Sequence, residues 1–311
     1  MNNLDHLLQR TSRTFGLAIP KLPEPIRGEV TIAYLMFRVA DTLEDAARWS
    51  RSERLEALAI LHAVISQGEV EAAGRYGQRW ADAVPIEHDG YLELLREFGR
   101  VMSAWAELRL TSRELIRTHC LRTVSAMSRF VDLGAQRGEL MLRSIEELGQ
   151  YCYGVAGIVG EMLTELFIHA CPELSVEASG LRSRAARFGE GLQLINILRD
   201  SLADARERRF FLPAGVSVQH LWGLAEADLQ AAEEYAEALQ RGGAPSGIVE
   251  FALLPIALAQ ATLDKMKTHG PGVKISRAEV ARIGEGVRAA VAAGVGCREG
   301  MARWACAEGR A

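Results

Sequence analysis

Two pairs of aspartates, each spaced four residues apart, are the part of this sequence best suited to chemistry. Asp41 and Asp45 bound one acidic segment, and Asp200 and Asp204 bound another. On a helix, this spacing places both carboxylates on one face, one turn apart, where like charges repel by roughly a few tenths of a kcal/mol. Each pair therefore favours a bound cation. Hard oxygen ligands with no Cys or His nearby favour Mg²⁺, which binds through one or two carboxylates plus substrate phosphates.

The helix that leads into the first pair is apolar on nearly every side, which is typical of helices in the centre of a bundle. The helix that leads into the second pair is also apolar but has one face of carboxylates and amides. Charged groups on such helices are costly unless they are paired or bind a metal. The first helix also carries Arg38, and the second presents Gln193, Asn196 and Arg199 at three- and four-residue intervals. One interpretation is that these groups merely solvate helix ends. Because the pattern occurs twice, we favour the polar rim of an otherwise apolar pocket.

Composition predicts a globular, helical protein. The chain has 311 residues, of which 49% are apolar and 24% are charged, and its net charge of −4 gives no indication of a nucleic-acid partner. Period-two alternation is almost absent, so we expect an all-α single domain over residues 1–311. Five cysteines without a C-x-x-C pair indicate reduced thiols. We expect no signal peptide and no membrane span, and therefore a cytoplasmic protein.

Helical periodicity predicts about eight to ten helices. Their expected positions are from residue 26 to the first motif, then 51–66, 91–108, 112–133, 144–170, 177–204, 226–239, 246–267 and 276–293, with an irregular polar stretch over 68–90. Glycines at 154, 157 and 160 do not match a dinucleotide-binding motif, and no strand precedes them. They either open a groove on their helix or allow close helix packing.

Four segments of the chain resemble the squalene/phytoene synthase family: Thr11–Phe15, Tyr34–Asp45, Tyr151–Gly160 and Asn196–Asp200. The stretch from Phe251 to Ile275 is similar to the squalene synthase branch. This resemblance implies an all-α class I isoprenoid synthase (terpenoid synthase) bundle around a central cavity. It also implies head-to-head condensation of two farnesyl diphosphates through presqualene diphosphate, with Mg²⁺ for ionisation and NADPH for the second step to squalene.

The resemblance also implies roles for individual residues. Asp41, Asp45, Asp200 and Asp204 would hold Mg²⁺; Arg13, Arg38, Arg199, Arg209 and Lys274 would hold diphosphate; Gln193 and Asn196 would line the polar mouth; Phe15, Val155, Val159, Phe251 and Pro255 would line the apolar cavity; and Tyr34 and Tyr151 would assist catalysis.

One position departs from the family pattern. Squalene synthases usually carry Glu where this chain has Ala203, so the second motif lacks one carboxylate. Three outcomes stay open: full squalene synthesis, a reaction that stops at presqualene diphosphate or makes dehydrosqualene or phytoene without NADPH, or a non-catalytic isoprenoid-binding protein. In a second departure, from eukaryotic squalene synthases, we expect no C-terminal membrane anchor here; peripheral membrane contact and oligomeric state stay open.

Overall fold

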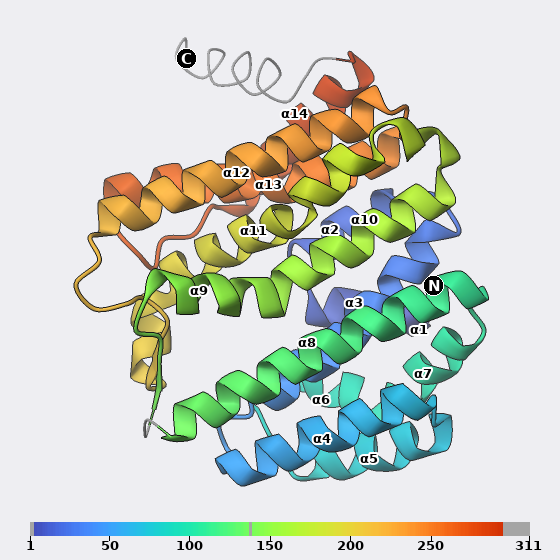
Figure 1. Ribbon diagram of the computed structural model, residues 1–311, viewed down its shortest axis with the longest axis vertical. Coiled ribbons are helices and arrows are strands. Elements are labelled where there is room, and N and C mark those ends of the chain that lie inside the picture. Colours follow the sequence, from blue (N-terminus) through green and yellow to red (C-terminus); the bar gives the residue numbers. More distant parts are fainter. Residues whose placement is uncertain (1–2, 137–138, 295–311) are drawn as a thin grey trace. The chain divides into compact units, whose positions relative to one another are not determined.

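The computed structural model describes residues 3–136 and 139–294, and it is almost entirely helical (Figure 1). The all-α prediction is confirmed: the strands in the described residues are Leu140–Met141 (β1) and Arg209–Phe210 (β2). Backbone contacts divide the chain into two compact units. Unit 1 comprises Met1–Ile19 and Glu24–Met141, and unit 2 comprises Pro20–Pro23 and Leu142–Ala311. The assignment of residues 1–311 to a single domain stays a prediction.

Unit 1 is built around α3 (Ile26–Glu44), as its apolar sequence predicts. This helix contacts α1 (Asn3–Thr11), α4 (Arg51–Gln67), α6 (Asp89–Arg96), α7 (Phe98–Ala106) and α8 (Leu110–Gln136). The buried Glu29 of α3 accepts hydrogen bonds from Arg109 and Ser112, both at 2.7 Å, so its charge is compensated inside the unit. A capping box at Ser50 and Glu53 starts α4. Central placement of α3 fixes where its acidic end lies.

The prediction of irregular structure over residues 68–90 is wrong, because most of this stretch forms α5 (Val70–Asp82). Its glycines serve helix packing rather than turns: a Cβ on Gly77 would lie 2.2 Å from the carbonyl oxygen of Leu95. A Cβ on Gly99 of α7 would lie 2.9 Å from the Cα of Gly74. The predicted helix over 91–108 is divided into two helices, α6 and α7. Partly for this reason, the α-helices of the described residues, labelled up to α14, exceed the predicted eight to ten.

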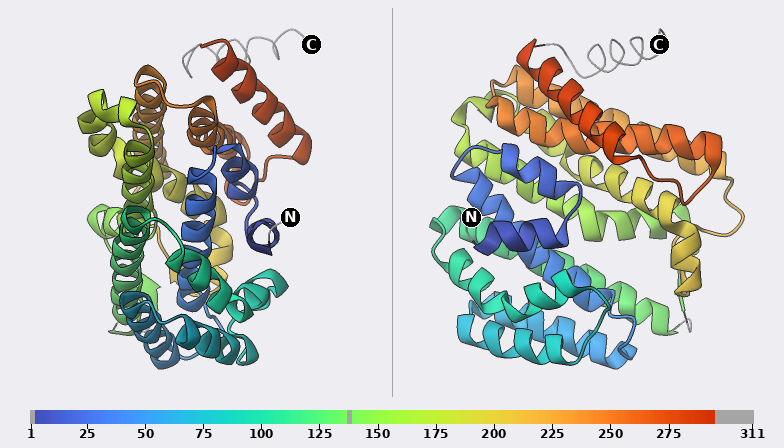
Figure 2. Two further views of the ribbon diagram at one scale, coloured as in Figure 1. Left: turned by 90° about the vertical axis from the view of Figure 1, so that its right-hand side faces the viewer. Right: turned by 180° about the vertical axis from the view of Figure 1, so that it is seen from behind.

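Unit 2 is built around α11 (Ala178–Arg206). This helix contacts α9 (Ile145–Cys152), η2 (Tyr153–Gly157), α10 (Ile158–Ala170), α12 (Val218–Arg241) and α13 (Ser246–His269). The last described helix, α14 (Arg277–Ala292), packs along α13 (Figure 2). Both acidic motifs therefore lie on the central helix of their own unit.

The glycines of the α9–α10 segment and of α11 let helices approach closely. A Cβ on Gly160 would lie 2.0 Å from the carbonyl oxygen of Ala185, and a Cβ on Gly189 would lie 2.0 Å from that of Ala156. Close packing is thus the right interpretation for Gly160. Between α9 and α10 the helix widens into the π-helical turn η2, a feature frequent at functional sites.

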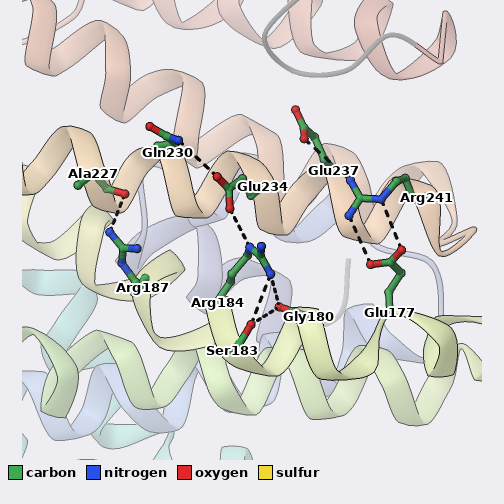
Figure 3. Close-up of polar contacts among 10 residues, drawn as sticks. All are labelled: Glu177, Gly180, Ser183, Arg184, Arg187, Ala227, Gln230, Glu234, Glu237 and Arg241. Atoms are coloured by element: carbon green, nitrogen blue, oxygen red, sulfur yellow. Dashed lines mark hydrogen bonds and ion pairs between the residues drawn. The ribbon is translucent and has the colours of Figure 1, made fainter.

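Side-chain contacts join α11 to α12 along their exposed edge (Figure 3). Arg184 donates to Glu234 at 3.0 Å, and Arg187 donates to the carbonyl of Ala227 at 2.8 Å. Near the other end of the pair, Arg241 and Glu177 approach within 3.4 Å. Individual exposed pairs contribute about 0–1 kcal/mol, so apolar burial must supply most of the stability here.

Two helical stretches are long and apolar enough to cross a membrane by length and composition, contrary to the expectation from sequence. They are Ile145–Ala170 and Ser246–His269, and 61% and 72% of their most apolar windows are buried. Such burial is shown by core helices too, so the finding is weak support for a span. Cys120, Cys152 and Cys171 are free and buried, whereas Cys297 and Cys306 lie outside the described residues.

Candidate active site

The first acidic motif lies at the C-terminal end of α3. Asp41 occupies the last turn, and Asp45 caps the helix by donating its backbone N–H to the carbonyl of Asp41 at 2.8 Å. The C-terminus of a helix carries partial negative charge, so a carboxylate there is disfavoured by about 0.3–1 kcal/mol. Asp204 has the same problem in the last turn of α11. Both motifs are therefore placed where positive charge is needed.

Arg38 supplies positive charge at the first motif. Its Nη1 lies 3.2 Å from Oδ2 of Asp41, and its Nε donates to the Tyr34 hydroxyl at 3.2 Å. That hydroxyl in turn donates to the carbonyl of Thr11 at 2.8 Å. The ring of Phe15 lies 6.0 Å from that of Tyr34, between centroids. The structure thus brings together four of the side chains predicted for the site.

Burial dominates the electrostatics of Asp41. It raises the pKa of this carboxyl, Arg38 lowers it and Asp45 raises it, with a net pKa of about 6. Burial by itself lowers the pKa of Arg38, but Asp41, Tyr34 and Tyr91 together raise it by more than burial lowers it. The net pKa is above its ordinary value, so the guanidinium stays charged. The predicted residue Arg13 is exposed in the turn before α2 (Phe15–Ala18).

Arginines also pair with both aspartates of the second motif. Arg199 binds Asp200 through two hydrogen bonds of 2.9 and 2.5 Å. The Nη2 of Arg209, which follows the helix, lies 3.2 Å from Asp204 and 2.8 Å from Glu207. Ala203 is exposed, so it lies in the solvent-facing part of this motif.

The loop after α13 reaches the second motif through the backbone. The N–H of Gly272 donates to the carbonyl of Arg199 at 2.8 Å, and Lys274, two residues further on, is exposed. Of the two predicted amides, Gln193 is half-buried and Asn196 is exposed. The structure therefore brings the segment that carries Lys274 to the end of α11 where the arginine–aspartate pairs lie.

The predicted cavity residues of unit 2 fall into two groups, one of which lies near the predicted catalytic residue Tyr151 in sequence. Tyr151 is buried beside Phe211, with ring centroids 4.7 Å apart, and Val155 and Val159 are half-buried on η2 and α10. Phe251 and Pro255 are buried in α13, where Phe251 meets Phe167 edge to face at 5.8 Å. Their role as cavity lining stays a prediction.

Sequence reasoning missed Tyr91 of α6, which joins the first motif. The guanidinium carbon of Arg38 lies 5.4 Å from the ring centroid of Tyr91 and 5.4 Å from that of Tyr34. Tyr91 is distant from the motif in sequence, and no spacing pattern connects them. Phe211, beside Tyr151, was missed for the same reason.

The aspartates suit Mg²⁺ by the chemistry of their donor atoms. Within residues 3–136 and 139–294, no three His, Cys, Asp or Glu side chains gather closely enough to hold a metal among themselves. Each motif offers two aspartate carboxylates. That number fits Mg²⁺, which takes one or two carboxylates and completes its shell with phosphate oxygens and water.

Residues 8–220 match the squalene/phytoene synthase family. A squalene synthase of Schizosaccharomyces pombe is 31% identical over 207 residues, which are 67% of this chain and 43% of that protein. The chain spans 42 to 44% of the length of this and two other curated squalene synthases, both from Botryococcus braunii.

Solved structures show the same fold. A complex of TcSQS with the ligand BPH1237 gives a TM-score of 0.74 at 24% identity, covering 92% of this chain and 85% of that one. A dehydrosqualene synthase in complex with a ligand gives 0.60 at 19% identity, covering 94% and 96%. The fold is therefore that of the all-α terpenoid synthases. Because the family match extends over most of the chain, this protein belongs to the squalene/phytoene synthase family.

Proposed function

We propose that this chain is a head-to-head prenyltransferase that condenses two farnesyl diphosphates, through presqualene diphosphate, to squalene. The observation that carries the proposal is that two aspartate motifs, each paired with arginine, stand at the ends of two central helices. Family membership supports prenyl transfer. The NADPH-dependent second step is supported by the similarity to squalene synthases.

In this proposal, Asp41, Asp45, Asp200 and Asp204 hold Mg²⁺. The bound metal would supply positive charge that stabilises the departing diphosphate. Arg38, Arg199 and Arg209 act with it, because a guanidinium can donate two parallel hydrogen bonds to phosphate. Charge on the leaving group grows as the carbon–oxygen bond breaks, so these donors stabilise the transition state more than the bound substrate.

The allylic cation left after diphosphate departure needs an apolar wall that excludes water. We assign this role to Phe15, Val155, Val159, Phe251 and Pro255. The ring faces of Tyr34 and Tyr151 would stabilise the cation, and their hydroxyls would steer or accept the proton lost in closing the cyclopropane. At Tyr34 the ring already lies against a cation, the guanidinium of Arg38.

A product assay tests the proposal directly. Purified protein is incubated with farnesyl diphosphate and Mg²⁺, with and without NADPH, and the products are identified by mass spectrometry. We expect presqualene diphosphate without NADPH and squalene only when NADPH is added. If farnesyl diphosphate is not consumed under any condition, the proposed activity is wrong.

Two variants test the metal assignment. Asp41→Asn and Asp200→Asn should each lower turnover by about 100-fold or more, since each 1.36 kcal/mol of lost transition-state stabilisation is tenfold in rate. Asp132→Asn is the matched control, because Asp132 also pairs with an arginine, Arg51, at 2.6 Å, but lies outside both motifs. Unchanged turnover in the two motif variants would remove their assigned role.

Ala203 motivates two alternatives. With one carboxylate fewer, the second ionisation can fail, and the protein then releases presqualene diphosphate. A second ionisation that ends in loss of a proton, without hydride from NADPH, would instead give dehydrosqualene or, from a longer prenyl chain, phytoene. In the other alternative, the protein binds isoprenoids without catalysis, and ligand binding without diphosphate release would reveal it. We place the protein in the cytoplasm, with peripheral membrane contact for its apolar product; the number of subunits is left to measurement.

A further inference from the structure

An aromatic stack surrounds the arginine of the first motif. The guanidinium carbon of Arg38 lies over the ring of Tyr34 and over the ring of Tyr91, 5.4 Å from each ring centroid. Tyr91 itself stacks on His88, with centroids 3.9 Å apart and an angle of 22° between the rings. All four residues belong to unit 1.

The first turn of α6 fixes the ring of Tyr91 in place. His88 is the N-cap of this helix, and its Nδ1 accepts a hydrogen bond from the backbone N–H of Tyr91 at 3.3 Å. The residue that caps the helix thus also stacks on the tyrosine ring. Tyr91 is half-buried, so its ring is partly shielded from water, and cation–π contacts strengthen as water is removed.

We propose that Tyr91 is a positioning residue that holds the Arg38 guanidinium against Asp41. The Nε of Arg38 is fixed by the Tyr34 hydroxyl, which leaves Nη1 directed at Asp41 at 3.2 Å. A second ring beside the guanidinium restricts its rotation away from that carboxylate. The contact of Tyr91 with Arg38 is made by the tyrosine ring.

Electrostatics near Tyr91 agrees with this role. Burial raises the pKa of its hydroxyl, Arg38 lowers it, and Tyr34, Asp41 and Asp45 raise it, with a net upward direction. The phenol therefore stays neutral at physiological pH and does not compete with Asp41 for the charge of Arg38. A neutral ring between a histidine and an arginine is suited to orientation rather than to proton transfer.

The consequence for ligand binding rests on the proposed function, because it takes Arg38 as a diphosphate ligand. The test measures binding of inorganic pyrophosphate with Mg²⁺ by calorimetry, without turnover. Tyr91→Leu should weaken binding by about 3- to 30-fold, the range expected for losing a partly desolvated cation–π contact. Tyr91→Phe keeps the ring and should stay within about twofold of the wild type.

A double-mutant cycle separates positioning from general packing. If Tyr91 acts through Arg38, then Tyr91→Leu should have no further effect in an Arg38→Gln background. Tyr76→Leu is the control, since Tyr76 stacks on Trp80 in the same unit, away from the contacts of Arg38. An equal loss in both backgrounds, or a loss in Tyr91→Phe as large as in Tyr91→Leu, would overturn the proposal.

An NMR measurement keeps the proposal independent of the reaction. The Nε–H resonance of Arg38, assigned by its disappearance in Arg38→Gln, should shift in Tyr91→Leu and stay in place in Tyr76→Leu. If the wild type fails to bind pyrophosphate but this resonance shifts, the diphosphate assignment is wrong and the positioning role stands. If the wild type binds and Tyr91→Leu changes neither affinity nor resonance, the positioning role is wrong.

Discussion

Replacing Glu190 with glutamine should make unit 2 more stable at alkaline pH. Glu190 lies on α11 in a half-buried position. Its carboxylate packs against Gly157, close enough that a Cβ added to this glycine would lie 3.0 Å from Oε1 of Glu190. Burial raises the pKa of this carboxyl, Asp228 raises it, Arg187 lowers it and Glu161 raises it, with a net pKa of about 7. Arg187 is already engaged by Asp228, to which it donates at 2.8 Å.

The sign of the effect follows from linkage. The folded pKa of Glu190 exceeds its ordinary value of 4.5, so between about pH 4.5 and pH 7 the folded state binds more protons than the unfolded state. The stability that Glu190 contributes is thus complete below pH 4.5 and is lost as pH rises through 7. A rise from 4.5 to about 7 corresponds to about 3 kcal/mol at 1.36 kcal/mol per pH unit. Because the side chain is only half-buried, solvent screening reduces our expectation to about 1–2 kcal/mol.

The assay is thermal unfolding between pH 5 and pH 8. Glu190→Gln should match the wild type at pH 5 and melt about 2–8 °C higher at pH 8, given roughly 2–4 °C per kcal/mol for a unit of this size. Glu173→Gln removes an exposed carboxylate from the same unit and serves as the control. A wild type and a Glu190→Gln variant with parallel pH profiles would refute the reasoning.

Three further predictions concern packing and the acidic motifs. Gly160→Ala should destabilise the protein by about 1–3 kcal/mol through its contact with the Ala185 carbonyl, whereas Gly149→Ala, with open space around its Cβ, should stabilise it by about 0.5–1 kcal/mol in the same denaturation assay. Since the pKa of Asp41 is about 6, Mg²⁺ affinity measured by calorimetry should fall as pH drops below 6, by up to about tenfold per pH unit; a flat profile would contradict this. Ala203→Glu should tighten Mg²⁺ binding, and Leu202→Glu, which adds the same charge on another face of the helix, should do so less; equal effects would show that only net charge matters.

Much of the fold could be predicted because the central helices have a recognisable sequence pattern. α3 is apolar on nearly all sides, α11 has an apolar stretch before its motif, and both end in charged residues, a combination that indicates burial and a functional end. The glycine-rich stretch that became α5 could not be predicted in this way, because Gly74 and Gly77 read as turn residues in sequence. Only the position of the facing helix shows that their missing side chains make room for backbone.

In the candidate site, too, some contacts follow from local spacing in the sequence and others depend on packing between helices. Asp41 and Arg38 are three residues apart, so helix geometry alone predicts their contact. Helix geometry does not predict the pairing of Arg199 with Asp200, because adjacent residues on a helix do not face each other. The contact of Arg38 with Tyr91 depends on how α6 packs against α3, which no local pattern encodes. The same holds for the approach of Gly272 to Arg199.

Spacing and packing determine different properties of the site. Motifs defined by spacing specify which groups are present, whereas the strength of each group depends on neighbours brought by packing. Here the second motif carries Ala203 between its two aspartates, and the first has its arginine in contact with the rings of Tyr34 and Tyr91. A guanidinium held at a fixed angle to Asp41 loses less entropy when it meets diphosphate than one that must first be ordered. If the first motif is preorganised in this way, it can hold the leaving group with fewer carboxylates elsewhere, and Ala203 becomes compatible with turnover.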